Sequence, residues 1–316
     1  MAFRIAHISD THLSASKPYF AANFLEVVNQ ISSGGADLVL NSGDMSLDGS
    51  AQESDLIEAR RLHDTLALPL RFIPGNHDIG ESQDAPRSRG LPILSAATRR
   101  RYLRHFGADY WCLHVPGWRV LAINDFLLGS DLAAADDQID FVRQVASTAG
   151  QAELALFTHR PLFHLSPDEQ EVSGRFVNPR PRAMLLAALG AAKPALIGSG
   201  HVHQFVSHDR WGSHHIWAPS TGFILPDASQ PHYGLKQTGY VEHLLKPDGS
   251  HFSRLVKIGG LASPSLADFP DAYAQYAAPP GRRLGTQQQR LPHPDRAAVG
   301  DVVTEPIAGR GKDQDG

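Results

Sequence analysis

The stretch FRIAHISDTH, residues 3–12, joins an apolar run, Phe3–Ile8, to a polar group that contains Asp10 and His12. A short apolar run bounded by polar residues is typical of a strand buried in a parallel sheet. Asp10 and His12 lie two positions apart, so in extended backbone their side chains point to the same side. The stretch therefore predicts a buried strand whose carboxyl end carries two side chains of metal-binding type.

Apolar runs and amphipathic stretches alternate after this first strand. The sequence predicts helices over 19–33 and 52–66, and strands over 37–41 and 70–73. This βαβαβ order predicts right-handed crossovers and a largely parallel sheet at the start of the chain.

The later part of the chain predicts a second set of strands. Pro116-Gly117 is a strong turn signal and predicts an antiparallel hairpin over 110–123. Further helices are expected over 136–149 and 182–192, and further strands over 153–157 and 195–197. Beyond them, short apolar runs predict a meander of antiparallel strands around Phe205, Ile216, Phe223, Val241 and Phe252. His208, His214 and His215 flank a turn in this region and are expected to be solvated.

Five of the predicted strands lead into residues of the types that bind metal ions. Ligands bind beyond the carboxyl ends of the strands in open α/β sheets, so we expect these residues to converge on one site. Gly43, Gly75 and Gly200 each precede a candidate ligand, and glycine allows the chain to approach an ion closely. The five blocks are Ser9-Asp10-Thr11-His12, Asn41-Ser42-Gly43-Asp44, Gly75-Asn76-His77-Asp78, Thr158-His159-Arg160-Pro161 and Gly200-His201-Val202-His203.

Each block taken alone also has an ordinary structural explanation. Gly-Asp pairs are common in turns, and a single histidine is more often a core residue than a metal ligand. All five blocks in this order, each behind a strand, favour a common site. Their Asp, Asn and His side chains, without a thiolate, suit Mn²⁺, Fe²⁺ or Zn²⁺.

The order Asp-x-His, Gly-Asp, Gly-Asn-His-Asp, His and Gly-His-x-His, from Asp10 to His203, resembles the calcineurin-like metallophosphoesterase superfamily. The opening HISDTHL and the chain length are similar to bacterial class III cyclic-nucleotide phosphodiesterases and glycerophosphodiesterases. This resemblance implies an α/β fold, a four-layer α/β/β/α sandwich with mixed sheets and two metal ions at its rim. It implies Asp10, His12, Asp44 and His203 as ligands of one ion, and Asp44, Asn76, His159 and His201 as ligands of the other.

In this scheme Asp44 would bridge the two ions. The resemblance also implies that His77 is a catalytic histidine that binds no metal and that Asp78 orients it. Two metal ions about 3.5–4 Å apart can hold both the attacking and the leaving side of an in-line displacement, with a bridging water losing a proton to become the nucleophile. Two divalent ions, the carboxylates of Asp10 and Asp44, and a hydroxide sum to a charge of about +1, which attracts a phosphodiester.

These features predict a dinuclear metal-dependent phosphodiesterase that acts on a small substrate, with a cyclic nucleotide such as cyclic AMP favoured. The expected cofactors are two divalent ions, Mn²⁺ or Fe²⁺ ahead of Zn²⁺. A phosphomonoesterase or glycerophosphodiesterase of the same fold is an alternative, and a non-catalytic metal-binding protein is another. Pro74 and Asp78 depart from the pattern of the Ser/Thr phosphoprotein phosphatases. Arg160 and His164 are candidates for substrate contacts, and Arg87 and Arg89 for the rim of the site.

The composition limits the classes of partner. The 316 residues carry a formal net charge of −4, with 42% hydrophobic residues, so a sizeable core can form. An acidic balance argues against a nucleic-acid polymer or a membrane surface as partner, whereas a homodimer stays open. One cysteine, Cys112, excludes an internal disulfide and clusters built from several thiolates. Because Arg4, His7 and Asp10 interrupt the first apolar run, we expect no signal peptide and a cytoplasmic protein.

The composition changes after about Gly260, where Ala, Pro, Gly, Gln and Arg dominate. We therefore predict a metallophosphoesterase domain over 1–262 and a Pro/Gly/Ala/Gln-rich extension over 263–316 that is largely disordered. Tyr273 and Tyr276 could dock the beginning of this extension back onto the domain.

Overall fold

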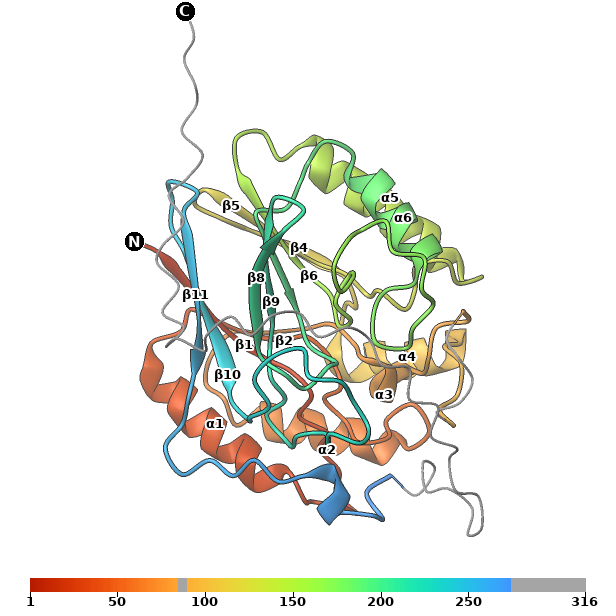
Figure 1. Ribbon diagram of the computed structural model, residues 1–316, viewed down its shortest axis with the longest axis vertical. Coiled ribbons are helices and arrows are strands. Elements are labelled where there is room, and N and C mark those ends of the chain that lie inside the picture. The colour runs from red at the N-terminus through yellow and green to blue at the C-terminus, as the bar shows by residue number, and fades with distance from the viewer. Residues whose placement is uncertain (85–89, 274–316) are drawn as a thin grey trace, which may run out of the picture.

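Two mixed β-sheets pack face to face, and helices cover the outer face of each sheet (Figure 1). The computed structural model describes residues 1–84 and 90–273. The resulting layers, α/β/β/α, confirm the predicted fold class. Arg87, Arg89, Tyr276 and the predicted extension beyond residue 273 lie outside the described residues.

The first sheet has the strand order β11-β10-β1-β2-β3. β1 (Phe3–Ile8), β2 (Leu38–Asn41) and β3 (Leu70–Phe72) run parallel, as the βαβαβ pattern predicts. The outer face is covered by α1 (Ala21–Gly34) and α2 (Glu53–His63), whose apolar stripes pack on β1 and β2. Short α3 (Asn76–Ile79) and α4 (Ala96–Phe106) follow β3.

The second sheet has the strand order β4-β5-β6-β7-β9-β8. The predicted hairpin is β4 (Trp111–Val115) with β5 (Trp118–Ala122), and β5, β6 (Glu153–Phe157) and β7 (Leu196–Ser199) run parallel. α5 (Ala133–Ser147) and α6 (Pro179–Leu189) cover the outer face of this sheet. The carboxyl ends of β6 and β7 therefore lie at the same edge of the molecule as those of β1, β2 and β3, as the contacts between them described below confirm.

The predicted meander is wrong, because the later strands form two separate hairpins. β8 (Val206–Arg210) and β9 (Ser213–Trp217) extend the second sheet, with β9 parallel to β7. β10 (Tyr240–Leu245) and β11 (His251–Val256) extend the first sheet through antiparallel pairing of β10 with β1. Hydrophobic patterning identifies a hairpin, but it does not say which sheet edge the hairpin joins. Phe223 lies outside the named strands.

The expected solvation of His214 and His215 is also wrong. β9 lies between β7 and β8, so all its residues are buried. His214 Nδ1 lies 3.2 Å from Nε2 of His251 on β11 in the opposite sheet. Burial lowers the pKa of His215 to about 3, so its imidazole is neutral in the core.

A chain of buried hydrogen bonds runs through the apolar layer between the sheets. Along β1, Ile5 and His7 face the other sheet, whereas Ala6 and Ile8 face α1. His7 Nε2 lies 2.9 Å from the Ser42 hydroxyl, and His7 Nδ1 lies 3.1 Å from Nε2 of His243. Burial lowers the pKa of His7 to about 3, although the Asp10 carboxylate acts in the opposite direction.

The start of the predicted extension packs on the domain. Ala272 and Tyr273 are buried in a cluster with Phe20, Leu47 and Phe223, which confirms the expected docking of Tyr273. No helix within residues 1–84 and 90–273 is long and apolar enough to cross a lipid bilayer.

The inter-sheet core makes a stability prediction. Phe157 is fully buried between the sheets, with its ring edge-on to His7 and His243 at centroid distances of 5.2 and 5.5 Å. Phe157→Ala should lower the free energy of unfolding by about 3–5 kcal/mol in a denaturant titration, because it leaves a cavity. Ile57→Ala on α2, where the side chain is 53% exposed, is the control and should change it by no more than about 0.5 kcal/mol. Equal effects of the two substitutions would contradict this description of the core.

Candidate metal centre

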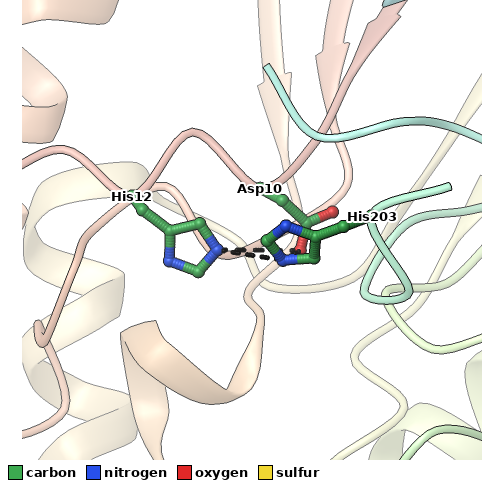
Figure 2. A group of neighbouring side chains, drawn as sticks. All are labelled: Asp10, His12 and His203. Carbon is green, nitrogen blue, oxygen red and sulfur yellow. Dashed lines mark hydrogen bonds and ion pairs between the residues drawn. The ribbon is translucent and has the colours of Figure 1, made fainter. Parts of the chain in front are cut away.

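The five sequence blocks meet at the carboxyl ends of β1, β2, β3, β6 and β7. Their side chains form three buried groups in which the potential ligand atoms lie within 4.8 Å of one another. In the first group, the rings of His12 and His203 approach each other beside the Asp10 carboxylate (Figure 2). The other two groups are Asp44 with His159 and His201, and His12 with Asp44 and His77.

The backbone at these strand ends adopts an unusual conformation. Among the described residues, six that are not glycine have positive φ angles, and five of these are predicted metal ligands. The left-handed region costs an ordinary residue about 1–2 kcal/mol and is less unfavourable for Asp and Asn. Asp10 and His12 therefore do not converge through extended backbone, as the sequence argument assumed, but through two left-handed turns. The five φ angles are 54° for Asp10, 46° for His12, 54° for Asp44, 68° for His201 and 55° for His203.

Two glycines let these turns approach each other. A Cβ atom on Gly75 would lie 2.1 Å from Asp44 Oδ1, and one on Gly200 would lie 1.8 Å from the Ser9 hydroxyl oxygen. No side chain fits at either position without displacing a neighbouring strand end. This explains why the sequence places glycine directly before a candidate ligand in these blocks.

Each of the two carboxylates uses one oxygen to accept a main-chain hydrogen bond and turns the other toward the imidazoles. Asp10 Oδ2 accepts from the His201 amide at 2.9 Å, and Asp44 Oδ1 accepts from the His77 amide at 2.8 Å. Asp10 Oδ1 lies 3.3 Å from Nε2 of His203. Asp44 Oδ2 lies 3.3 Å from Nε2 of His159 and 3.9 Å from Nε2 of His12. Asp44 thus stands between the two groups of histidines.

The four candidate imidazole ligands are oriented by contacts at the ring nitrogen that faces away from the carboxylates. A proton on that nitrogen leaves the lone pair of the other nitrogen directed inward, which is the tautomer that metal ligation requires. These contacts are His159 Nδ1 to the Ser42 carbonyl at 2.8 Å, His201 Nε2 to the Gly174 carbonyl at 2.8 Å, His203 Nδ1 to the Phe223 carbonyl at 3.2 Å and His12 Nδ1 to the Tyr273 hydroxyl at 2.7 Å.

Two buried acceptor atoms indicate that the site fits a cation. Asp10 Oδ1 and Asn76 Oδ1 are buried and accept no hydrogen bond. The Asn76 amide group is held by a 2.9 Å hydrogen bond to Glu81, which fixes which atom faces the centre. A buried acceptor without a partner costs about 1–3 kcal/mol. Oxygen and imidazole donors of this kind suit a divalent ion of the Mn²⁺, Fe²⁺ or Zn²⁺ type.

The charges at the centre also fit a bound cation. Burial disfavours charge on both Asp44 and His159, but their mutual attraction outweighs it. The pKa of Asp44 is lowered well below its ordinary value, and the pKa of His159 is raised to about 10. The carboxylate thus attracts a proton to the place where a metal ion would bind, and metal binding would release that proton.

The structure places His77 at the centre but gives Asp78 a different role from the one predicted. His77 Nδ1 donates to the Leu47 carbonyl at 2.8 Å, so a main-chain group orients the ring. The Asp78 carboxylate instead accepts hydrogen bonds from the main-chain amides of residues 45, 46 and 75 and from the Ser46 hydroxyl. Asp78 therefore holds the loops after β2 and β3 together. Burial, followed by the Asp44 charge, raises the pKa of Asp78 to about 6.

Arg160 and His164 were predicted to contact the substrate, and the geometry corrects both predictions. Arg160 is fully buried, its Nε donates to Asp125 at 2.7 Å, and its guanidinium lies 4.3 Å above the Phe126 ring. His164 packs among Phe176, Trp217 and Tyr233. Neither residue lines the cavity at the metal centre.

A cavity of about 290 Å³ opens beside the centre, near the lower limit for small-molecule sites. His12, Asp44, Asn76, His77, His201 and His203 form its polar side. Phe223, Leu225 and Leu266 form an apolar wall, and Arg175 supplies a positive charge. Arg175 also donates to the Ser229 carbonyl at 3.1 Å, which joins the loop before α6 to another loop that lines the cavity.

Asp125, Glu81 and Arg175 are not among the site residues predicted from the sequence, and Tyr273 is predicted only to dock on the domain. Asp125 accepts from the His159 amide at 2.9 Å as well as from Arg160. It follows β5 in the polar pair Asn124-Asp125, so the rule that identified the other five strand ends could have found it. The other three lie in loops or in the C-terminal segment, where no periodic pattern marks them.

Several known proteins similar to this chain are phosphoesterases by their descriptions. A sequence model described as calcineurin-like phosphoesterase matches residues 3–205. The 3′,5′-cyclic adenosine monophosphate phosphodiesterase CpdA of Pseudomonas aeruginosa is 30% identical over 186 residues, which span 58% of this chain and 61% of that protein. A Synechococcus protein named as a probable cyclic nucleotide phosphodiesterase is 25% identical over 270 residues, 81% of this chain and 92% of its own. The purple acid phosphatase PPD1 of yellow lupin (Lupinus luteus) has a TM-score of 0.59 at 14% identity, covering 90% of this chain and 57% of its own, which shows a similar fold.

The buried ion pair of Arg160 with Asp125 leads to a second prediction. Arg160→Met should lower the free energy of unfolding by about 3–5 kcal/mol, because it leaves the buried Asp125 charge without its partner. Arg143→Met is the matched control, since Arg143 pairs with Asp140 on the surface with 61% and 74% of the side chains exposed. Arg143→Met should lower the free energy of unfolding by no more than about 1 kcal/mol. An Arg160→Met protein of unchanged stability but raised KM would restore the substrate-contact interpretation.

Proposed function

The chain belongs to the calcineurin-like phosphoesterase family, and on that premise we propose that it is a dinuclear metal-dependent phosphodiesterase. The observation that carries the proposal is that Asp10 Oδ1 and Asn76 Oδ1, two buried acceptors beside the candidate imidazole ligands, accept no hydrogen bond. A buried acceptor of this kind is stable in a protein interior when a cation lies beside it.

The proposed ligand sets follow the two groups of histidines, with Asp44 common to both. One ion is held by Asp10, His12, Asp44 and His203, and the other by Asp44, Asn76, His159 and His201. We propose Mn²⁺ or Fe²⁺ as the native ions ahead of Zn²⁺, because two of the four ligands in each set are oxygen donors and neither set contains a thiolate. When bound, two divalent ions lower the pKa of water and neutralise charge that develops on a phosphoryl group.

His77 is proposed as the general acid. The Leu47 carbonyl holds the proton of Nδ1, so Nε2 is the nitrogen that can donate to a bound ester. As the attacking water gives up a proton and its oxygen bonds to phosphorus, the bond from phosphorus to the leaving oxygen breaks. That oxygen takes the proton from Nε2, which leaves His77 with the Nδ1 proton alone. His77 lines the cavity and is 7% exposed, which keeps the ring next to the substrate and largely away from bulk water.

The proposed substrate is a small phosphodiester, with a 3′,5′-cyclic nucleotide favoured. A monoester dianion calls for several cationic groups, and within the described residues Arg175 is the sole Arg or Lys that lines the cavity. The apolar wall of Phe223, Leu225 and Leu266 suits a nucleobase more than the polar chain of a glycerophosphodiester. The names of the Pseudomonas and Synechococcus relatives support the same class.

Hydrolysis of bis(p-nitrophenyl) phosphate with added Mn²⁺ tests the proposal. We expect turnover that EDTA abolishes and that His77→Ala reduces by about 10²–10⁴-fold through loss of the general acid. His114→Ala on β4, where the side chain is exposed and pairs with Arg119, is the matched control and should keep the wild-type rate. Wild-type turnover no faster than that of His77→Ala would contradict the proposal.

The same preparations distinguish the substrate classes. We expect kcat/KM for 3′,5′-cyclic AMP to exceed the values for a glycerophosphodiester and for p-nitrophenyl phosphate. A higher value for p-nitrophenyl phosphate would favour the phosphomonoesterase alternative, and metal binding without any turnover would favour the non-catalytic one.

A further inference from the structure

We infer that Tyr273 is a positioning residue of the metal centre and that residues 262–273 are a working part of the site. The inference rests on the proposed function, because it assigns a role to a contact of the proposed ligand His12. Tyr273 lies well beyond residues 3–205, which match the family.

Tyr273 holds His12 at the nitrogen opposite to the one that faces the carboxylates. The Tyr273 hydroxyl lies 2.7 Å from His12 Nδ1, whereas His12 Nε2 lies 3.9 Å from oxygens of both Asp10 and Asp44. A ligating nitrogen must present a lone pair, so the ring proton must sit on Nδ1. The phenol oxygen of Tyr273 then accepts this proton and fixes both the tautomer and the rotation of the ring.

His12 differs from the other three imidazoles in the kind of group that orients it. His159, His201 and His203 contact main-chain carbonyls, which any residue supplies. His12 contacts a side-chain hydroxyl from a residue 261 positions away in the sequence. One ligand of one ion therefore depends on the identity of a single residue near the end of the described chain.

The segment that carries Tyr273 is itself fixed to the domain. Lys17 Nζ donates to the Asp271 carbonyl at 2.6 Å, and the Tyr19 hydroxyl donates to the Asp271 carboxylate at 2.5 Å. Ala272 and Tyr273 are buried. Hydrogen bonds and burial, and not only the contact with His12, therefore hold the Tyr273 hydroxyl in place. Further tethers are Asn23 and Thr238 to the Ala262 carbonyl, and two main-chain hydrogen bonds of Ile224, to Pro264 and Leu266.

The ring of Tyr273 has a second effect that is separable from that of its hydroxyl. It lines the cavity and packs on the rings of His77 and Phe223 at centroid distances of 5.1 and 6.0 Å. Tyr273→Phe removes the hydroxyl and keeps this wall. Tyr273→Ala removes both.

Mn²⁺ binding to the full chain, followed by the electron paramagnetic resonance signal of the free ion, tests the inference. We expect two sites in the wild type and, in Tyr273→Phe, a dissociation constant about 10–100-fold larger at one site and unchanged at the other. Tyr273→Ala should show the same weakening together with a raised KM for the diester. Tyr110→Phe is the matched control, because this ring packs on Phe141 of α5 at 5.3 Å and should leave both constants unchanged.

Each other outcome overturns a defined part of the argument. Two unchanged sites in Tyr273→Phe would overturn the positioning role. Equal weakening of both sites, with a lower Tm of the metal-free protein, would assign Tyr273 to general stability and would also overturn it. A wild-type protein without two Mn²⁺ sites would overturn the proposed function itself.

Discussion

The burial of two carboxylates, Asp10 and Asp44, is the constraint on which the site depends. Both side chains are almost completely removed from water, where an uncompensated charge would be costly. Each carboxylate satisfies one oxygen with a main-chain amide and turns the other toward imidazoles, so its charge remains available at the centre. The arrangement is stable when a cation takes up that charge. The proposed metal ions would supply the positive charge that balances these two carboxylates.

The rest of the architecture brings the candidate ligands to these two carboxylates. Parallel strands of both sheets end at one edge, and left-handed backbone turns the side chains inward there. Gly75 and Gly200 allow strand ends to approach within contact distance. Three buried charged side chains hold the loops in place through hydrogen bonds: Asp78 binds the Ser46 amide, and Asp125 binds the His159 amide and Arg160. The cavity takes its apolar wall from residues after 205, so the segment that matches the family supplies the candidate ligands and the later segment shapes the cavity beside them.

Much of this could be predicted from the sequence, because strand ends in α/β sheets carry ordered signals. The strands Phe3–Ile8 and Glu153–Phe157 have the predicted bounds, and the five polar blocks converge as expected. The sequence pattern does not show which side chains pair in the folded protein. Arg160 pairs with Asp125, 35 positions earlier, so the sequence alone does not reveal that this arginine is buried in an ion pair. Likewise, the contact of His12 with Tyr273 joins residues near the two ends of the described chain, and no periodic pattern in the sequence predicts it.

Anomalous diffraction from crystals grown with Mn²⁺ tests the central claim most directly. The account predicts two peaks about 3.5–4 Å apart, one bonded by Asp10, His12 and His203 and the other by Asn76, His159 and His201, with Asp44 between them. A single peak, or peaks away from the ends of these five strands, would contradict it.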